Sequence, residues 1–246
     1  MEMSAPGSIW LTRPRPDSER MAQSLQTRGI ETIVAPVMEI RPLPLHIPSA
    51  RDPKALLVTS RHATFALAAL PARWRSLPVY CVGKATALAA TKLGYNHCIT
   101  GKGSALSLLP RIMAHQQGGD MILHLSGEEI RVPLGPMLAP YGITITRTIV
   151  YSAIATAALP DTLLDALDGQ RVRGAVFYSP RSVTLAKQLL AHHQRPDALN
   201  HADAFCLSMA IAGQAAALHC QRLMACHTPT HHAMMELLTR PAIGEP

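Results

Sequence analysis

Short apolar segments alternate with segments of helical periodicity along the whole chain. The apolar run GAVFYS at 174–179, for example, precedes apolar residues spaced three or four positions apart at 181–191. Regular alternation of this kind is typical of a parallel sheet covered by helices, so we expect an α/β fold. Expected strands are 8–11, 31–37, 55–59, 78–82, 96–100, 121–125, 174–179, 203–208 and 222–226, and expected helices are 17–28, 62–69, 84–93, 104–115, 131–139, 181–191, 210–219 and 230–238.

Two extended segments interrupt the alternation. The first, MEIRPLPLHIPSARDP at 38–53, is rich in proline and lacks periodicity. The second, ITITRTIVYSAIATA at 143–157, is a long run of β-prone residues. We expect two domains joined by linker strands at 39–49 and 146–156.

The two halves of the chain repeat each other. LLVTSRHAT aligns with VFYSPRSVT and pairs Thr59 with Ser179, an offset of 179 − 59 = 120. Further aligned pairs are Gly83 with Ser208, Cys81 with Cys206, Thr12 with Ser126 and Gly29 with Gly142. If each domain needs one copy of every part, 1–38 must join 157–246, while 50–145 forms the inserted domain. We therefore expect two similar three-layer, flavodoxin-like domains with a cleft between them.

Polar turns follow the predicted strands in both copies. Parallel α/β sheets bind ligands at the carboxyl ends of their strands, beside helix N-termini that attract anions. A serine such as Ser179 can instead serve only as a helix cap. Six such turns at matching strand ends favour a binding site, and they lie at Thr12-Arg13, Thr59-Ser60, Gly83, Ser126-Gly127, Ser179 and Ser208.

Charge and composition restrict the partner of such a site. The 246 residues carry a net charge of +7 with a pI near 9.5, yet the basic residues are scattered and only 4% of residues are aromatic. Nucleic-acid binding usually needs a basic stripe or stacking aromatics, so a small polyanion fits better than a nucleic acid. The usual nucleotide-binding glycine motifs are missing from the sequence.

The cysteine spacing and the hydropathy of the chain indicate the cellular compartment in which we expect the protein. The five cysteines have no C-x-x-C spacing and read as reduced core thiols of a cytoplasmic protein. The first residues do not resemble a signal peptide, and no apolar run is long enough to span a membrane. The adjacent histidine pairs 192–193 and 231–232 cannot readily chelate one ion, so we expect them to be solvated.

Five short motifs, in this order and with this duplication, resemble the uroporphyrinogen-III synthase (HemD-like) family over nearly the whole chain. The sequence departs from the family pattern in its last third, where Ser208 and Ile211 stand in place of a glycine and a threonine. The motifs are Thr12-Arg13-Pro14, Thr59-Ser60-Arg61, Val82-Gly83-Lys84-Ala85-Thr86-Ala87 with Gly94, Ser126-Gly127-Glu128 and Val150-Tyr151.

The resemblance implies a monomeric, cytoplasmic lyase that needs no cofactor and no metal. Its substrate would be hydroxymethylbilane, a linear tetrapyrrole with eight carboxylates, received in transient contact with hydroxymethylbilane synthase. The enzyme would release water and close the ring with the last pyrrole inverted. Tyr151 would be catalytic, helping the hydroxyl group to leave. The implied substrate-binding residues are Thr12, Arg13, Thr59, Ser60, Gly83, Thr86, Ser126, Gly127, Ser179 and Ser208.

Alternatives remain open at this point. A non-enzymatic two-domain protein that binds a small anion would use the same strand-end turns, and so would a flavodoxin-like pair that binds a flavin or nucleotide. Tyr151 could serve only to pack the linker, and Arg13 could be an exposed cation without a specific role.

Overall fold

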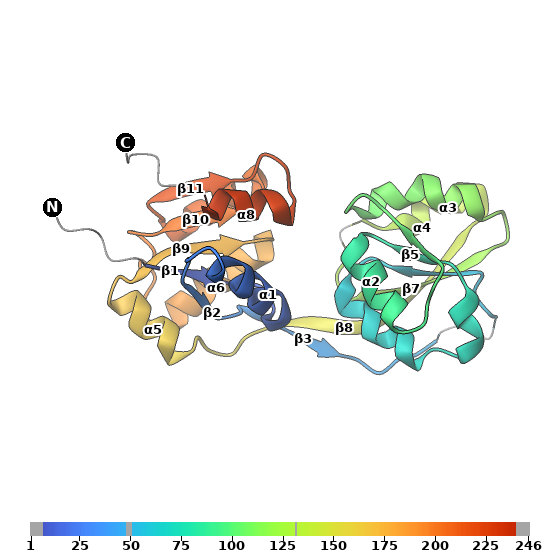
Figure 1. Ribbon diagram of the computed structural model, residues 1–246, viewed down its shortest axis with the longest axis horizontal. Helices are drawn as coiled ribbons and strands as arrows, with labels where there is room; N and C mark the ends of the chain where they lie inside the picture. The colour runs from blue at the N-terminus through green and yellow to red at the C-terminus, as the bar shows by residue number, and fades with distance from the viewer. Residues whose placement is uncertain (1–6, 48–50, 131, 240–246) are drawn as a thin grey trace. The chain divides into compact units, whose positions relative to one another are not determined.

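The chain forms two compact units. Unit 1 comprises Met1–Glu39 and Ile154–Pro246, and unit 2 comprises Ile40–Ala153. The computed structural model describes residues 7–47, 51–130 and 132–239. The chain passes from one unit to the other within β3 (Met38–Pro42) and within β8 (Thr144–Ala155), which neighbour each other in one sheet (Figure 1).

Unit 1 contains a five-stranded sheet in the order β11-β10-β9-β1-β2, and its strands pair in parallel. Its strands are β1 (Ser8–Leu11), β2 (Thr32–Val34), β9 (Val172–Phe177), β10 (Asp203–Cys206) and β11 (Arg222–Ala225). Its helices are α1 (Arg15–Gln26), α5 (Asp161–Asp168), α6 (Pro180–His192), α7 (Met209–Ala215), η5 (Ala216–Leu218) and α8 (His231–Thr239).

Helices cover both faces of this sheet because successive strand residues point to opposite sides. Trp10 lies in the core under α5, α6 and α7, while Ile9 and Leu11 lie in the core under α1 and α8. All three side chains are at most 1% exposed. Unit 1 is therefore a three-layer α/β structure, as expected.

Unit 2 contains a six-stranded sheet in the order β3-β8-β7-β4-β5-β6. Its remaining strands, which pair in parallel, are β4 (Ala55–Val58), β5 (Val79–Cys81), β6 (Cys98–Thr100) and β7 (Met121–Gly127). Its helices are η1 (Arg61–Ala69), η2 (Ala72–Ser76), α2 (Lys84–Lys92), η3 (Ala105–Leu108), α3 (Leu109–His115), α4 (Leu134–Leu138) and η4 (Ala139–Tyr141), where η marks 3₁₀ geometry.

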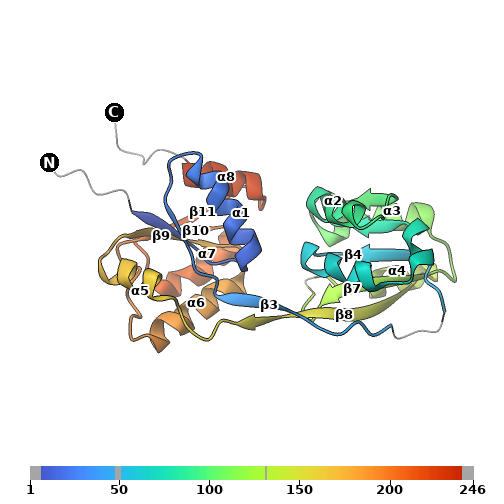
Figure 2. The same ribbon diagram turned by 60° about the horizontal axis from the view of Figure 1, so that its bottom comes forward.

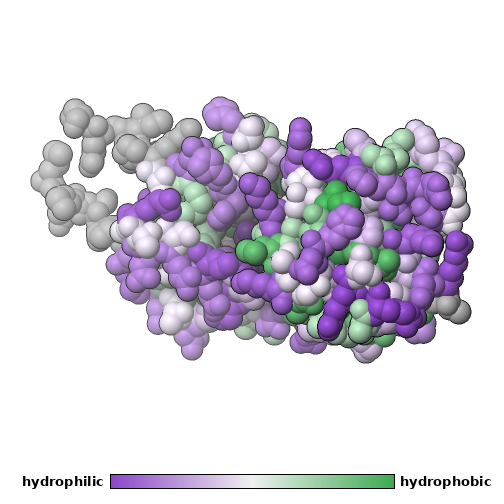
Figure 3. All heavy atoms as spheres, turned by 45° about the vertical axis from the view of Figure 1, so that its right-hand side comes forward, coloured by the Kyte–Doolittle hydropathy of each residue, from purple (hydrophilic) through white to green (hydrophobic). Residues whose placement is uncertain are grey.

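The same alternation builds two cores in unit 2. Leu56 and Val58 pack under η1, η2 and α2, whereas Ala55 and Leu57 pack under η3, α3 and α4. Figure 2 shows helices on both sides of the strands. On the face of unit 2 turned toward the viewer in Figure 3, hydrophobic residues form small groups among hydrophilic ones. No helix of the described residues is long and apolar enough to cross a membrane.

The strand orders of the two sheets agree with the repeat in the sequence. Read through the aligned pairs, β2-β1-β9-β10-β11 of unit 1 corresponds to β8-β7-β4-β5-β6 of unit 2. The inserted unit therefore has the same strand order. The chain enters this common order at β1 in unit 1 and at β4, the equivalent of β9, in unit 2. The expectation of two similar parallel α/β domains is confirmed.

Several boundaries differ from the sequence-based expectations. Residues 61–69 form a 3₁₀ helix that ends before Pro71, because a residue that precedes proline favours extended backbone. The helix expected at 131–139 is the short α4, which begins after Pro133. Much of the expected linker strand 146–156 pairs with β7 through Tyr151.

Candidate active site

The polar residues predicted from the sequence lie at the carboxyl ends of the strands in each sheet; Ser126 and Gly127 are the last residues of β7, and the others follow their strands. Since the strands of each unit pair in parallel, these residues share one edge of their sheet. Three surface hollows lie at the opposite, amino edges, and one of them is lined by Ser8 and Thr32, which begin β1 and β2. Open α/β sheets bind ligands at the carboxyl edge, so we place the candidate site there.

Tyr151 lies directly on Gly127 in unit 2. A methyl group added at Gly127 would come within 2.5 Å of the Tyr151 ring and 2.7 Å of its hydroxyl oxygen. A β-bulge produces this contact, since Ser126 pairs with Ile149 but Gly127 pairs with Tyr151. Because of the extra residue, Val150 and Tyr151 both pack against the apolar core under η1 and α2.

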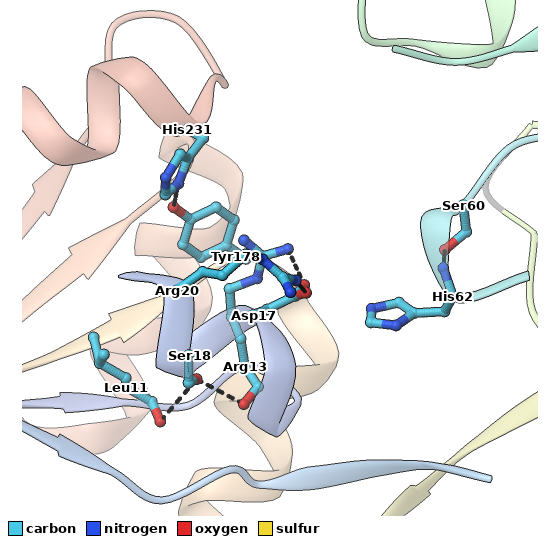
Figure 4. A network of polar contacts seen from close by, with 9 residues as sticks. All are labelled: Leu11, Arg13, Asp17, Ser18, Arg20, Ser60, His62, Tyr178 and His231. Atoms are coloured by element: carbon cyan, nitrogen blue, oxygen red, sulfur yellow. Dashed lines mark hydrogen bonds and ion pairs between the residues drawn. The ribbon is translucent and has the colours of Figure 1, made fainter. Parts of the chain in front are cut away.

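His62 flanks the tyrosine on the same face. Its ring meets the Tyr151 ring edge-on, with 6.0 Å between the ring centroids. The backbone N–H of His62 donates to the Ser60 hydroxyl at 3.2 Å, which fixes the start of η1 (Figure 4). Ser60 is thus a helix cap, and it positions a histidine beside the predicted catalytic residue.

Arg147 holds the end of β7 from the neighbouring strand β8. Its Nε donates to Ser126 Oγ at 2.7 Å, and its Nη2 donates to the carbonyl oxygens of Gly127 and Glu128. The Ser126 hydroxyl is fully buried and donates in turn to the Gly127 carbonyl at 3.0 Å. One guanidinium therefore fixes the turn on which Tyr151 rests.

Thr59 is bonded to a buried histidine. Its hydroxyl lies 2.9 Å from Nε2 of His124, whose side chain is 4% exposed. Burial lowers the pKa of His124 to about 4, and the nearby Arg147 charge adds to this effect. His124 is therefore neutral at pH 7 and serves as a polar neighbour of Thr59.

Gly83 is the N-cap residue of α2 and has extended backbone, and its carbonyl accepts the N–H groups of Thr86 and Ala87. A methyl group added at Gly83 would meet nothing within 4 Å, so this turn leaves open space above the helix N-terminus. Thr86, in the first turn of α2, is buried.

The predicted hydroxyl residues of unit 1 differ in what they contact. The buried Thr12 donates to the Val176 carbonyl at 2.5 Å and so joins β1 to β9. Ser179 forms a capping box with Ser182, in which each hydroxyl accepts the other residue's N–H. Ser208 also precedes a helix, but its hydroxyl makes no capping bond. Of the two serines that precede helices here, Ser179 uses its hydroxyl to cap the helix and Ser208 does not.

Arg13 belongs to a network at the same edge of unit 1 (Figure 4). Its guanidinium lies 4.1 Å from the centroid of the Tyr178 ring and forms an ion pair with the buried Asp17, which also binds Arg20 at 2.5 Å. The Tyr178 hydroxyl lies 2.7 Å from Nδ1 of His231. Burial lowers the pKa of Arg13, and Tyr178 opposes this shift.

The family model for uroporphyrinogen-III synthase HemD matches residues 19–236. This chain belongs to the uroporphyrinogen-III synthase HemD family. The uroporphyrinogen-III synthetase structure from Helicobacter pylori is similar, with a TM-score of 0.60 and 16% identity over 94% of this chain and 98% of that one. A mutant uroporphyrinogen III synthase from Thermus thermophilus has a TM-score of 0.51 and 15% identity over 95% and 98% of the two chains. No curated protein matches the sequence significantly.

Within this member of the HemD family, sequence reasoning missed several residues at the strand ends. His124, Arg147 and His62 support predicted residues in unit 2, but each is a single polar residue in a strand or helix start and gives no motif. His231 is exposed, as expected, and its ring is also bonded to the Tyr178 hydroxyl, which the sequence did not indicate. Among the described residues, no group of three or more metal-binding side chains occurs.

Proposed function

We propose that this protein is a uroporphyrinogen-III synthase, a lyase that cyclises hydroxymethylbilane to uroporphyrinogen III. The family match over residues 19–236 carries this proposal. The placement of Tyr151 on Gly127, at the carboxyl edge of a parallel sheet, supports it.

The proposed reaction requires little acid–base power and close control of conformation. Loss of the terminal hydroxyl group leaves an electrophilic azafulvene, which the substituted carbon of the last pyrrole attacks to form a spiro intermediate. Fragmentation and recombination then close the ring with that pyrrole inverted. Because the substrate also cyclises spontaneously to the uninverted isomer, the protein must hold the chain in the geometry of spiro attack.

In this proposal Tyr151 donates a hydrogen bond or a proton to the departing hydroxyl group. A phenol is an effective donor in its protonated form. Gly127 supplies the close approach that the ring needs, and Arg147 fixes the turn beneath it. The reaction needs no redox step and therefore no redox cofactor, and we further propose that no metal takes part.

The remaining residues would bind the carboxylates and the pyrrole chain. Hydroxyls, backbone N–H groups and Arg13 can bind carboxylates, while Gly83 leaves room for the substrate to approach a helix N-terminus. The proposed contacts are Arg13, Thr59, Ser60, Gly83, Thr86, Gly127, Ser179 and Ser208. The hydroxyls of Thr12 and Ser126 are buried and donate to main-chain carbonyls, so these two residues would act by fixing the strand ends beside the substrate.

The decisive experiment supplies freshly prepared hydroxymethylbilane to the purified protein in the presence of a chelator. The uroporphyrinogens are oxidised to porphyrins, and the isomers are separated by chromatography. We expect mainly isomer III. Isomer I alone, at the spontaneous rate, would show that the protein does not catalyse this reaction and would favour an anion-binding protein.

We also propose that the protein acts as a cytoplasmic monomer that receives its unstable substrate in transient contact with hydroxymethylbilane synthase. The molecular mass of the purified chain, measured by sedimentation, tests whether it is a monomer. For the contact, the yield of isomer III is compared in a coupled assay with and without an inert crowding protein. The coupled assay is also run at limiting hydroxymethylbilane synthase, once with the two enzymes mixed and once with a membrane between them. If the yield of isomer I is the same in both arrangements, the substrate is not handed over in direct contact.

A further inference from the structure

The network around Arg13 has the charge balance of an anion site. Asp17, whose side chain is 1% exposed, binds the guanidinium groups of both Arg13 and Arg20. Two cations therefore share one buried carboxylate, and a positive charge remains at the surface of the network. An anion that reaches this edge would be attracted to it.

Arg13 retains donors for such an anion. A guanidinium carries five N–H donors in a planar fork, and among the described residues Arg13 uses Nη2 for the Asp17 carboxylate and also interacts with the Tyr178 hydroxyl, so further donors remain. Its side chain is 25% exposed, so part of the group is accessible to a ligand. The planar fork suits a carboxylate better than a point charge does.

Tyr178 determines the orientation of this guanidinium. Its ring lies under the planar group at 4.1 Å, and its hydroxyl is fixed by His231 at 2.7 Å. Tyr178 comes from the end of β9, and His231 begins α8, so two elements support the side chain that follows β1. At the aligned position of unit 2 stands Val58, which can neither stack with a cation nor form this hydrogen bond.

We propose that Tyr178 and His231 are positioning residues that hold Arg13 in place to bind one carboxylate of the substrate. This inference rests on the proposed function for the identity of the substrate, but the carboxylate site itself does not depend on catalysis. Because the network binds a substituent and not the departing hydroxyl group, it sets KM and leaves kcat nearly unchanged.

Kinetic constants of four variants test the inference. We expect Tyr178→Val to raise KM about fivefold to twentyfold, since the cation–π contact and the hydrogen bond are both lost. Tyr178→Phe keeps the ring and should raise KM by about twofold to fivefold. His231→Gln should resemble Tyr178→Phe. The matched control is His232→Gln, because His232 is an exposed neighbour that pairs with Glu236 at 3.3 Å and does not contact Tyr178 in the described network.

A binding experiment separates this inference from the proposed function. Uroporphyrin, an unreactive tetrapyrrole with eight carboxylates, is titrated into each variant and followed by its fluorescence. We expect Tyr178→Val and Arg13→Met to weaken binding by similar factors, and the double variant to be little weaker than either one. This result would support the carboxylate site even if the wild-type protein formed no isomer III.

Two outcomes would overturn the inference. If Tyr178→Val lowers kcat as strongly as it raises KM, the residue has a different role. If uroporphyrin binding is unchanged in folded Tyr178→Val and Tyr178→Phe variants, the network does not bind carboxylates. Melting temperatures of all variants show whether a weakened variant is folded, and Tyr178→Phe keeps the test valid if the valine variant unfolds.

Discussion

The substitution Gly127→Ala tests the contact on which the candidate site depends. A Cβ atom at this position would lie 2.5 Å from Tyr151 Cζ, 2.6 Å from Cε2 and 2.7 Å from the hydroxyl oxygen. Ordinary contacts between such atoms begin near ~3.5 Å, so the ring must move by about 1 Å. Overpacking of this size costs about 1–3 kcal/mol of stability.

The same displacement should affect catalysis more than stability. A catalytic group misplaced by about 1 Å loses on the order of 100-fold in rate. We therefore expect Gly127→Ala to lower kcat for formation of isomer III by about 10-fold to 100-fold, with a smaller change in KM. Isomer chromatography gives the rate, and chemical denaturation followed by circular dichroism gives the stability.

A second glycine provides the control for the alanine substitution itself. Gly213 lies in α7 without positive φ, and an added Cβ would meet nothing within 4 Å. Gly213→Ala should stabilise unit 1 by up to about 1 kcal/mol through helix propensity. If Gly127→Ala instead kept both its stability and its kcat, the placement of Tyr151 on Gly127 would be refuted.

Three further predictions concern Tyr151 itself and residues that support this edge of the sheet. Tyr151→Phe should lower kcat by about 10-fold to 1000-fold while the melting temperature stays within a few degrees, and an unchanged kcat would leave Tyr151 a packing role only. Arg147→Met should cost about 1–3 kcal/mol in urea titrations because the buried Ser126 hydroxyl and Gly127 carbonyl lose the guanidinium donor, and Arg147→Lys should recover part of that loss. The pKa of His124 is about 4 in the folded protein, below its value in the unfolded chain, so the unfolded state binds the extra proton. The free energy of unfolding should therefore fall by up to about 3 kcal/mol as the pH drops from about 6.5 to about 4. A His124→Gln variant should lack this pH dependence.

Much of the fold follows from local patterns in the sequence. The alternation in segments such as 55–58 assigns Ala55 and Leu57 to one core and Leu56 and Val58 to the other, as the structure has it. The repeat predicted two similar sheets because aligned segments have the same apolar pattern and must bury it in the same way. Helix types and ends were less predictable, as 61–69 shows, because the choice between 3₁₀ and α geometry there depends on packing and on Pro71.

The candidate site was only partly accessible from the sequence. Strand-end positions could be predicted for Thr59 and Ser126, since parallel strands bring their carboxyl ends to one edge. What each hydroxyl contacts could not be predicted, and Ser179 caps its helix where Ser208 does not. Arg147 stands alone in a β-prone run, and His231 belongs to an adjacent histidine pair, so no local pattern indicates which strand-end residues they contact.

The sequence by itself determined the α/β class, the duplication, the family and the positions of the strand-end turns, because hydrophobic periodicity and short motifs are local properties of a chain. Only the tertiary structure decided which side chains meet. The bulge between β7 and β8 sets Tyr151 on Gly127, and Tyr178 meets His231 across 53 positions of the chain. Such contacts depend on strand register and on the packing of distant segments, and neither is encoded in any short stretch of residues.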